Sequence, residues 1–296
     1  MGAINGASTG AESGRSVSAG IGDTRTAAGY TEAVSFDDAG RLRFDVRPAG
    51  DPAATLVIAS SVFAELQRNY RREVLLARAA AAAGIASVRF HYRGAGNSIA
   101  GSQVRLESMT DDVLEVARSV SGPVVLVGTR VGALAVARAR THLDVPAVLW
   151  EPVVDGSRWV EEVIRACLAR EVAHGVGVSS DSIRARWASD GRVFVLGETV
   201  PVGIVDDVGG ADLVAALGGS SPVQLVQMGR NEKIRPELER ARSAIEENGT
   251  PVEVLPIVGR QTWWVNEGGD LFRPVERDEA TTSLIQGVLS FAKGAA

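Results

Sequence analysis

Short apolar runs alternate along the chain with longer segments that carry apolar residues at helical spacing. The short runs, rich in Val, Leu and Ile, predict strands at 33–36, 42–46, 55–60, 86–91, 123–128, 145–151, 222–228 and 251–257. The longer segments predict helices at 69–83, 106–120, 131–142, 236–247 and 279–293. The first two strands flank a turn-like Asp-Asp-Ala-Gly segment and predict a hairpin. Alternating strands and helices indicate an α/β protein with a mostly parallel central sheet flanked by helices.

Residues 152–219 interrupt this alternation. They combine predicted helices at 157–172 and 211–217 with a polar stretch rich in Gly and Ser and a short strand-like run at 192–196. We therefore predict an α/β domain over residues 29–296 that carries an insertion at 152–219. Residues 1–28 consist largely of Gly, Ala, Ser and Thr with scattered charges, so we expect a disordered tail there.

The segment Gly128-Thr129-Arg130-Val131-Gly132 lies between a predicted strand and a predicted helix. A strand, a G-x-x-x-G turn and a helix make up the nucleophile elbow of α/β-hydrolases, which presents its central residue to the active site. The small flanking residues let the backbone turn sharply. The central residue should be Ser, Cys or Asp, but it is Arg130, whose guanidinium stays protonated and cannot attack a carbonyl. The segment therefore predicts a hydrolase scaffold without its usual nucleophile.

Three further segments support this interpretation: residues 63–73 (FAELQRNYRRE), 91–98 (HYRGAGNS) and 149–156 (LWEPVVDG). With the elbow, they resemble the hydrolases associated with exosortase A systems, a branch near the serine aminopeptidase-like hydrolases. The resemblance covers roughly residues 30–296. It implies the α/β-hydrolase fold, with the insertion at 152–219 in the position of a lid.

The resemblance also implies where a Ser-His-acid triad would lie. The nucleophile position falls on Arg130, and the acid should follow the strand that ends at Met228, where Glu232 is a candidate. The general base should be a His in the loop after Ile257, but residues 258–264 (VGRQTWW) contain none. Because His carries the proton in both half-reactions, its absence argues more strongly than the Arg against triad catalysis. We expect a degraded triad.

Two interpretations of Arg130 stay open at this stage. In the first, Arg130 and the backbone N–H groups at a helix N-terminus bind an anionic group of a ligand. In the second, Arg130 forms an internal ion pair with Glu65, Glu151 or Glu232 and fills the former active site. What lies within hydrogen-bond reach of its guanidinium separates the two.

Other candidate residues have both a functional and a structural interpretation. The resemblance implies that the N–H groups of Val62 and Val131 are the oxyanion-hole donors. Trp263 and Trp264, in the loop that lacks the His, either roof an apolar pocket for a ligand or pack beneath that loop.

A relocated catalytic centre is the other possibility for these strand ends. Ser60 or Ser61 would act as the nucleophile with His91 as its base, because their strands end at the same edge of the sheet. Structurally, the two serines would satisfy backbone groups of a loop, and His91 would be a hydrogen-bonded residue at the end of a strand.

Composition excludes several classes of partner. The formal net charge of −5 gives no support for binding to nucleic acid or to a membrane surface. The single cysteine, Cys167, excludes an internal disulfide and a Cys-based zinc site, and three histidines leave little room for a metal centre. We expect no cofactor, no membrane span and a cytoplasmic location.

The sequence supports three functional hypotheses. The first is a non-catalytic protein that binds an anionic or acyl small molecule or acts as an accessory protein. The second is a hydrolase of esters, thioesters or amides with a non-standard centre, and the third is an assembly partner of an active hydrolase. The sequence identifies neither the ligand nor the oligomeric state.

Overall fold

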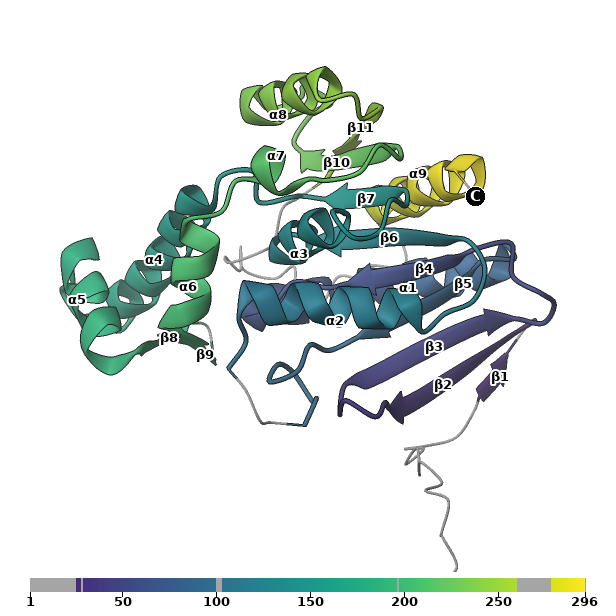
Figure 1. The fold of residues 1–296 in the computed structure, drawn as a ribbon. Helices are drawn as coiled ribbons and strands as arrows, with labels where there is room; N and C mark the ends of the chain where they lie inside the picture. The colour runs from purple at the N-terminus through teal and green to yellow at the C-terminus, as the bar shows by residue number, and fades with distance from the viewer. Residues whose placement is uncertain (1–24, 28, 100–102, 196, 260–277, 296) are drawn as a thin grey trace, which may run out of the picture.

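A nine-stranded sheet forms the centre of the molecule (Figure 1). The computed structural model describes residues 25–27, 29–99, 103–195, 197–259 and 278–295. The strand order is β1-β2-β3-β5-β4-β6-β7-β10-β11, and every pairing from β5 to β11 is parallel. The strands are β1 Arg25–Ala27, β2 Tyr30–Phe36, β3 Leu42–Pro48, β4 Thr55–Ala59, β5 Ala86–Phe90, β6 Val124–Thr129, β7 Ala147–Trp150, β10 Val223–Gly229 and β11 Val252–Val258.

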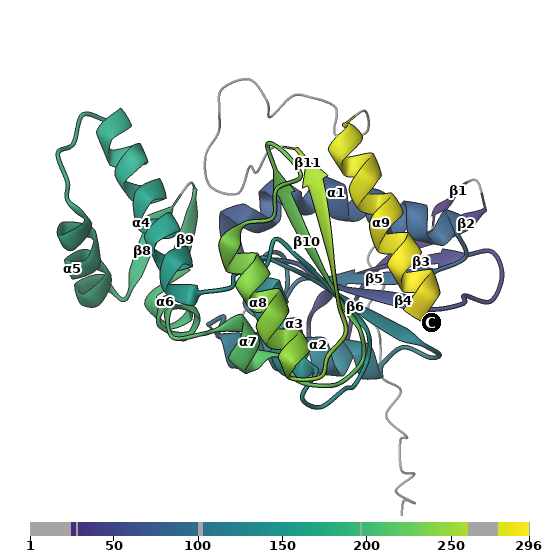
Figure 2. The same cartoon turned by 90° about the horizontal axis from the view of Figure 1, so that it is seen from above.

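Helices cover both faces of this sheet. On one face lie α1 (Phe63–Ala82) and α9 (Glu279–Ala295), and on the other lie α2 (Leu106–Arg118), α3 (Val131–Ala139) and α8 (Pro236–Glu247) (Figures 1 and 2). Strands β4, β5 and β7 are buried along their whole length. Burial on both faces favours apolar residues along a strand, as in β4 and β7, whereas β5 also buries Ser87 and Arg89.

The insertion predicted at 152–219 lies between β7 and β10, and we call residues 152–219 the inserted segment. It holds α4 (Gly156–Ala173), α5 (Ser180–Asp190), α6 (Val202–Gly209), α7 (Leu213–Ala216) and the antiparallel hairpin of β8 (Arg192–Val195) and β9 (Glu198–Pro201). Most of it projects beyond one end of the sheet (Figures 1 and 2). Trp159, Ile183 and Trp187 are buried within it, so it has apolar packing of its own.

The predicted elements of the α/β core are confirmed, apart from the start of α1 and the additional strand β1. Helix α1 begins at Phe63, six residues before the predicted start, because the buried polar residues Glu65, Asn69 and Glu73 hide its apolar periodicity. Strand β1 lies within the segment predicted as a disordered tail. Arg25–Ala27 pairs with β2, so for these three residues the prediction is wrong.

Within the inserted segment, the sequence pattern does not indicate β9, α5 or α6. In α5 only Ile183 and Trp187 are buried, and two apolar positions are too few to produce a helical pattern in the sequence. Tertiary packing against α4 and β8 stabilises this helix.

Candidate functional site

Strained backbone marks one edge of the sheet. Among the described residues, three non-glycine residues have positive φ: Phe63 (56°), Arg130 (53°) and Glu151 (47°). They lie just after β4, β6 and β7, which are neighbours in the sheet, so all three are at its carboxyl edge. Strained residues cluster at functional sites, and ligands of open α/β sheets bind at this edge. The geometry therefore places a candidate site here.

The elbow segment forms the sharp turn that its sequence predicts. Arg130 stands between β6 and α3 with φ 53° and ψ −117°. A Cβ atom added to Gly132 would lie 2.3 Å from the backbone oxygen of Ala59, and one added to Gly128 would lie 2.6 Å from the Cα atom of Ala133. Neither position has room for a side chain, so both glycines are needed for helix α3 to lie this close to β4 and β6.

Arg130 forms ion pairs with carboxylates from two different elements. Its Nε atom donates to Glu65 Oε1 of α1 at 2.9 Å, and its guanidinium also pairs with Glu162 of α4. The Trp159 indole donates to the same Glu65 oxygen at 3.3 Å. Arg130 is 5% exposed and Glu65 is fully buried, whereas the Glu162 side chain is 34% exposed. The guanidinium thus links the core to the inserted segment.

The electrostatics keep Arg130 charged. Burial by itself would lower the pKa of Arg130, but the carboxylates of Glu65 and Glu162, with a smaller contribution from Glu151, raise it above its ordinary value. Burial raises the pKa of the Glu65 carboxyl, and the charge of Arg130 and a hydrogen bond from Ser61 offset only part of this increase. Arg130 is therefore a fixed cation, unsuited to act as a nucleophile or as a base.

The hydroxyls of the two candidate serines each donate to a buried glutamate. Ser60 Oγ donates to Glu73 Oε2 and Ser61 Oγ to Glu65 Oε2, both at 2.5 Å. Thr129 also donates to Glu73, at 3.2 Å. Burial raises the pKa of the Glu73 carboxyl, and the hydrogen bond from Ser60 partly offsets this effect. Both serines are buried.

His91 is not hydrogen-bonded to either serine. Its Nδ1 accepts a hydrogen bond from the backbone N–H of Asn97 at 3.0 Å, and its Nε2 has no hydrogen-bond partner among the described residues. Its ring lies beside Phe44, with 5.4 Å between the centroids. Burial, with the nearby charge of Arg89, lowers the pKa of His91 to about 4. His91 therefore stays neutral at pH 7, and the relocated centre lacks the expected serine–histidine hydrogen bond.

The structure distinguishes two of the predicted carboxylates, Glu151 and Glu232. Glu232 is exposed in the loop after β10 and forms no ion pair among the described residues. Glu151 is fully buried instead, accepting hydrogen bonds from the backbone N–H of Met228 and, at 3.1 Å, from Arg235. Burial raises the pKa of the Glu151 carboxyl, against the opposing charge of Arg235.

The sequence pattern does not single out Glu162 or Glu73. Each lies in a helix among other charged residues, so nothing in the local pattern distinguishes a buried or paired carboxylate from a solvated one. Their spacing from Arg130 and Ser60 along the chain carries no signal either, because the contacts are made by the fold.

The remaining predicted residues are only partly placed. Val62 precedes α1 and Val131 opens α3, so both lie at helix N-termini at this edge, and both are buried. Their role as oxyanion donors stays a prediction. Trp263 and Trp264 lie outside the described residues.

Two kinds of feature are absent from the described part of the chain. It contains no group of three or more His, Cys, Asp or Glu residues that could hold a metal ion. Among the same residues, no helix has the length and apolar character needed to cross a membrane.

Comparison with known proteins identifies the fold. The chain matches no protein-family model and no curated protein sequence. Solved structures do match: an esterase from Butyrivibrio proteoclasticus, Est1E, with ferulic acid bound has a TM-score of 0.61 at 13% identity, covering 88% of this chain and 96% of the esterase.

Two further structures agree with this result. A putative hydrolase from Agrobacterium vitis has a TM-score of 0.58 at 16% identity, covering 88% of this chain and 98% of that one. The α/β hydrolase domain-containing protein 10 from mouse has a TM-score of 0.56 at 15% identity, covering 90% and 99%. These likenesses span nearly the whole of each chain and agree with the parallel sheet flanked by helices. The protein therefore has the α/β-hydrolase fold.

Proposed function

We propose that this protein is a non-catalytic member of the α/β-hydrolase fold that works as a binding or accessory protein. The supporting observation is Arg130 at the elbow, buried and paired with Glu65 and Glu162. Acyl transfer needs a nucleophile that can give up a proton and a base that can take it. A permanently charged guanidinium held by two carboxylates supplies neither.

The ion pairs favour a filled site over an anion receptor at Arg130. Two carboxylates against one guanidinium leave this cluster with a formal charge of −1, and Glu65 is fully buried. An anionic ligand would have to displace Glu65 and leave that carboxylate without its partner, which costs several kcal/mol, on the order of 3–5. We therefore propose that an anionic or acyl ligand, if the protein binds one, binds elsewhere.

In this proposal Arg130 has a structural role, because it holds the inserted segment on the core. A second contact supports this role: Arg105, just before α2, donates to both carboxylate oxygens of Asp207 in α6 at 2.6 and 2.7 Å. With Arg130–Glu162 and the pair between Arg158 of α4 and Glu237 of α8, three ion pairs among the described residues thus join the core to the inserted segment. The segment would be a lid held shut by charge.

A hydrolase of esters, thioesters or amides is the second candidate. Its support is that Ser60 and Ser61 each donate to a buried carboxylate that could accept the proton of an attacking hydroxyl. The third candidate is an assembly partner of an active hydrolase, and the paired Arg130 at the elbow supports this candidate as well. We also propose that the protein belongs to the exosortase A-associated branch, which the three short motifs support. We further propose a cytoplasmic location.

A fluorophosphonate probe, which labels activated serines, tests the proposal. We expect no labelling above the level of the Ser60→Ala and Ser61→Ala variants. Turnover of activated esters should stay within the roughly 10³–10⁴-fold acceleration over water that binding alone leaves in enzymes without a triad. Covalent labelling that one of these substitutions abolishes would contradict the proposal and select the hydrolase.

The Arg130→Ser variant tests whether the site already contains a general base. We expect no gain of ester hydrolysis, because triad residues act as a unit and a lone serine is a weak nucleophile at neutral pH. Arg138→Ser, on the same helix, is the control for a lost charge. A gain of more than about 10³-fold would show a working base. Light scattering, with the protein alone and with candidate partners, distinguishes an assembly partner from a small-molecule binder.

A further inference from the structure

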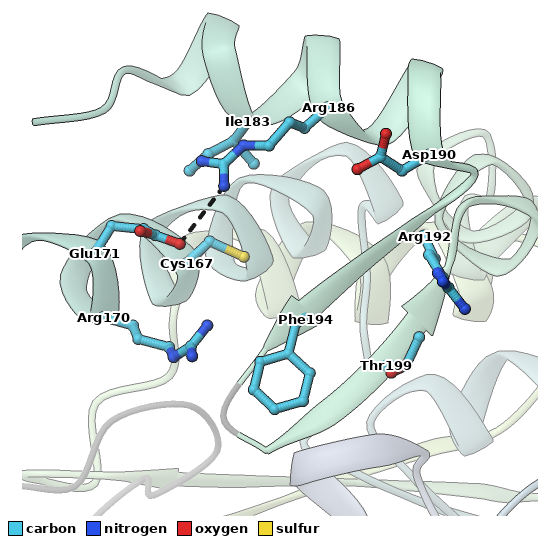
Figure 3. A pocket seen from close by; sticks show the side chains of 9 residues that line it. All are labelled: Cys167, Arg170, Glu171, Ile183, Arg186, Asp190, Arg192, Phe194 and Thr199. Carbon is cyan, nitrogen blue, oxygen red and sulfur yellow. Dashed lines mark ion pairs between the residues drawn. The ribbon is translucent and has the colours of Figure 1, made fainter. Parts of the chain in front are cut away.

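A second concave site lies within the inserted segment, away from the elbow (Figure 3). A cavity of about 480 Å³ is lined by α4, α5 and the β8–β9 hairpin. This volume falls in the range that holds small organic ligands, roughly 300–1,000 Å³. The cavity shares no lining residue with the Arg130 cluster.

Arginines dominate the charge of this cavity, although the protein as a whole carries a net charge of −5. Arg170 of α4, Arg186 of α5 and Arg192 of β8 all line it (Figure 3). Arg186 pairs with Glu171 at 3.7 Å. Arg170 and Arg192 form no ion pair among the described residues.

Three guanidiniums face two carboxylates in this lining. The second carboxylate belongs to Asp190, and its Oδ1 accepts a hydrogen bond from Ser189. The cavity therefore has an excess of one positive charge, which matches a ligand with a single negative charge. Guanidiniums bind carboxylates through paired N–H donors.

An aromatic side chain is exposed inside the same cavity. Phe194 is 47% exposed, although large apolar side chains are usually buried. Residues two apart on a strand point to the same face, so Phe194 and Arg192 face the cavity together. The Arg170 guanidinium stacks over the Phe194 ring, 4.7 Å from its centroid. The apolar ring thus lies next to the Arg170 cation, and Arg192 lies on the other side of the ring (Figure 3). Neither cation has a carboxylate partner among the described residues.

Cys167 adds a neutral surface to this lining. It is buried in α4, and its sulfur is drawn among the lining side chains in Figure 3. Burial and the charge of Glu171 raise the pKa of the Cys167 thiol to about 11, so it is protonated at neutral pH. A protonated thiol behaves as a small apolar group.

We propose that this cavity binds a small organic monocarboxylate with a flat aromatic body. Arg170 and Arg192, which lie on different sides of Phe194 in Figure 3, supply the positive charge that attracts the carboxylate, and the ring of the ligand packs against Phe194 and Cys167. The inference goes beyond the proposed function, because it assigns a ligand class to residues that take no part in closing the elbow.

Three probes of matched shape or charge test the ligand class. Isothermal titration calorimetry and ligand-observed NMR should show that 2-naphthoate binds. The neutral 2-naphthamide, which has the same ring system, should bind at least about 10-fold more weakly, because it lacks the charge that the arginines recognise. Inorganic phosphate, which has charge without an apolar body, should also bind more weakly than 2-naphthoate. Equal affinity for the acid and the amide, or no binding of 2-naphthoate at millimolar concentration, overturns the proposal.

Variants locate the binding. Arg192→Gln and Arg170→Gln should each weaken 2-naphthoate binding by about 10-fold or more, and Phe194→Leu should weaken it as well. Two matched controls remove an arginine outside the cavity: Arg165→Gln on α4 and Arg184→Gln on α5, whose partner is the exposed Glu161. The controls should bind like the parent. If Arg192→Gln, Arg170→Gln and Phe194→Leu all bind 2-naphthoate like the parent, the site is wrong.

Binding of 2-naphthoate should not depend on Arg130 at the elbow. Arg130→Met should bind 2-naphthoate like the parent, provided that it is measured where it is folded. Failure of 2-naphthoate to bind would leave the fluorophosphonate result unchanged. Serine labelling would overturn the proposed function without affecting the cavity.

Discussion

The elbow and the cavity of the inserted segment both use arginine, but with opposite consequences. Arg130 is 5% exposed and contacts two carboxylates, one fully buried. Arg170 and Arg192 line an open cavity and form no ion pair among the described residues. A charge removed from water must be paired, whereas an exposed charge can remain available. Burial therefore decides which arginine is structural and which is free to bind a ligand.

The backbone reinforces this difference. Arg130 projects from a strained turn locked by two glycines, and its partners come from α1 and α4. Arg192 stands on a two-stranded hairpin in the projecting inserted segment. The first environment restricts the guanidinium to one geometry, and the second allows it to adjust to a ligand. Three predictions test this contrast, and one tests the neutral state of His91 at the same edge of the sheet as Arg130.

The largest expected effect is that of Arg130→Met. Methionine keeps most of the side-chain volume and the same positive φ, so the change removes the charge without altering the turn. Stranding the buried Glu65 should lower the free energy of unfolding by about 3–5 kcal/mol in a urea titration. Adding Glu65→Gln should recover part of this loss. Arg138→Met, on the same helix, is the control, and a loss below about 1 kcal/mol for Arg130→Met would show that the pair is not held as described.

The second prediction concerns acid. The folded-state pKa of His91 is lowered to about 4 from 6.5, so on acidification the unfolded chain binds this proton first. The lowered pKa therefore contributes to the free energy of unfolding. This stabilisation is fully present above pH 6.5 and is lost as the pH falls from 6.5 to 4, by about 3 kcal/mol in all.

His91→Asn isolates this effect from that of the buried carboxylates, whose raised pKa values act in the opposite direction. Asparagine keeps an acceptor for the N–H of Asn97 but does not titrate. Denaturation at a series of pH values should show the drop in the parent and a smaller one in the variant. Identical pH profiles would refute the assignment to His91.

A smaller effect is expected for Glu162→Gln. The Glu162 side chain is 34% exposed, so its loss should cost about 1 kcal/mol or less. Hydrogen exchange should nevertheless become faster in α4, because one of the three ion pairs between the core and the inserted segment is gone. Glu161→Gln, which changes the neighbouring exposed residue that pairs with Arg184, is the matched control. Equal exchange in both variants would argue against a lid held by Arg130.

The smallest effect is expected for Arg192→Gln without ligand. Its side chain is exposed and has no ion-pair partner among the described residues, so the free energy of unfolding should stay within about 0.5 kcal/mol of the parent. A chemical denaturation curve checks this. A larger loss would mean that Arg192, like Arg130, is structural, and the contrast between the two regions would fail.

The sequence by itself determined the α/β architecture, the place of the insertion and the turn at Arg130. These follow from local rules: strand and helix periodicity, and glycines where the chain must turn sharply. Those rules did not predict the start of α1 or the helix α5. Buried polar residues hide the helical period of apolar residues in α1, and α5 has too few buried apolar positions to show one.

Only the tertiary structure decided what surrounds the candidate residues. The sequence left Glu65, Glu151 and Glu232 as equal partners for Arg130; the fold selected Glu65, added Glu162 and left Glu232 exposed. It likewise joined Ser60 to Glu73 rather than to His91, and grouped Arg170, Arg192 and Phe194 around one cavity. Ion pairs and cavities depend on distances between residues far apart in the chain, and those distances exist only after the chain has folded.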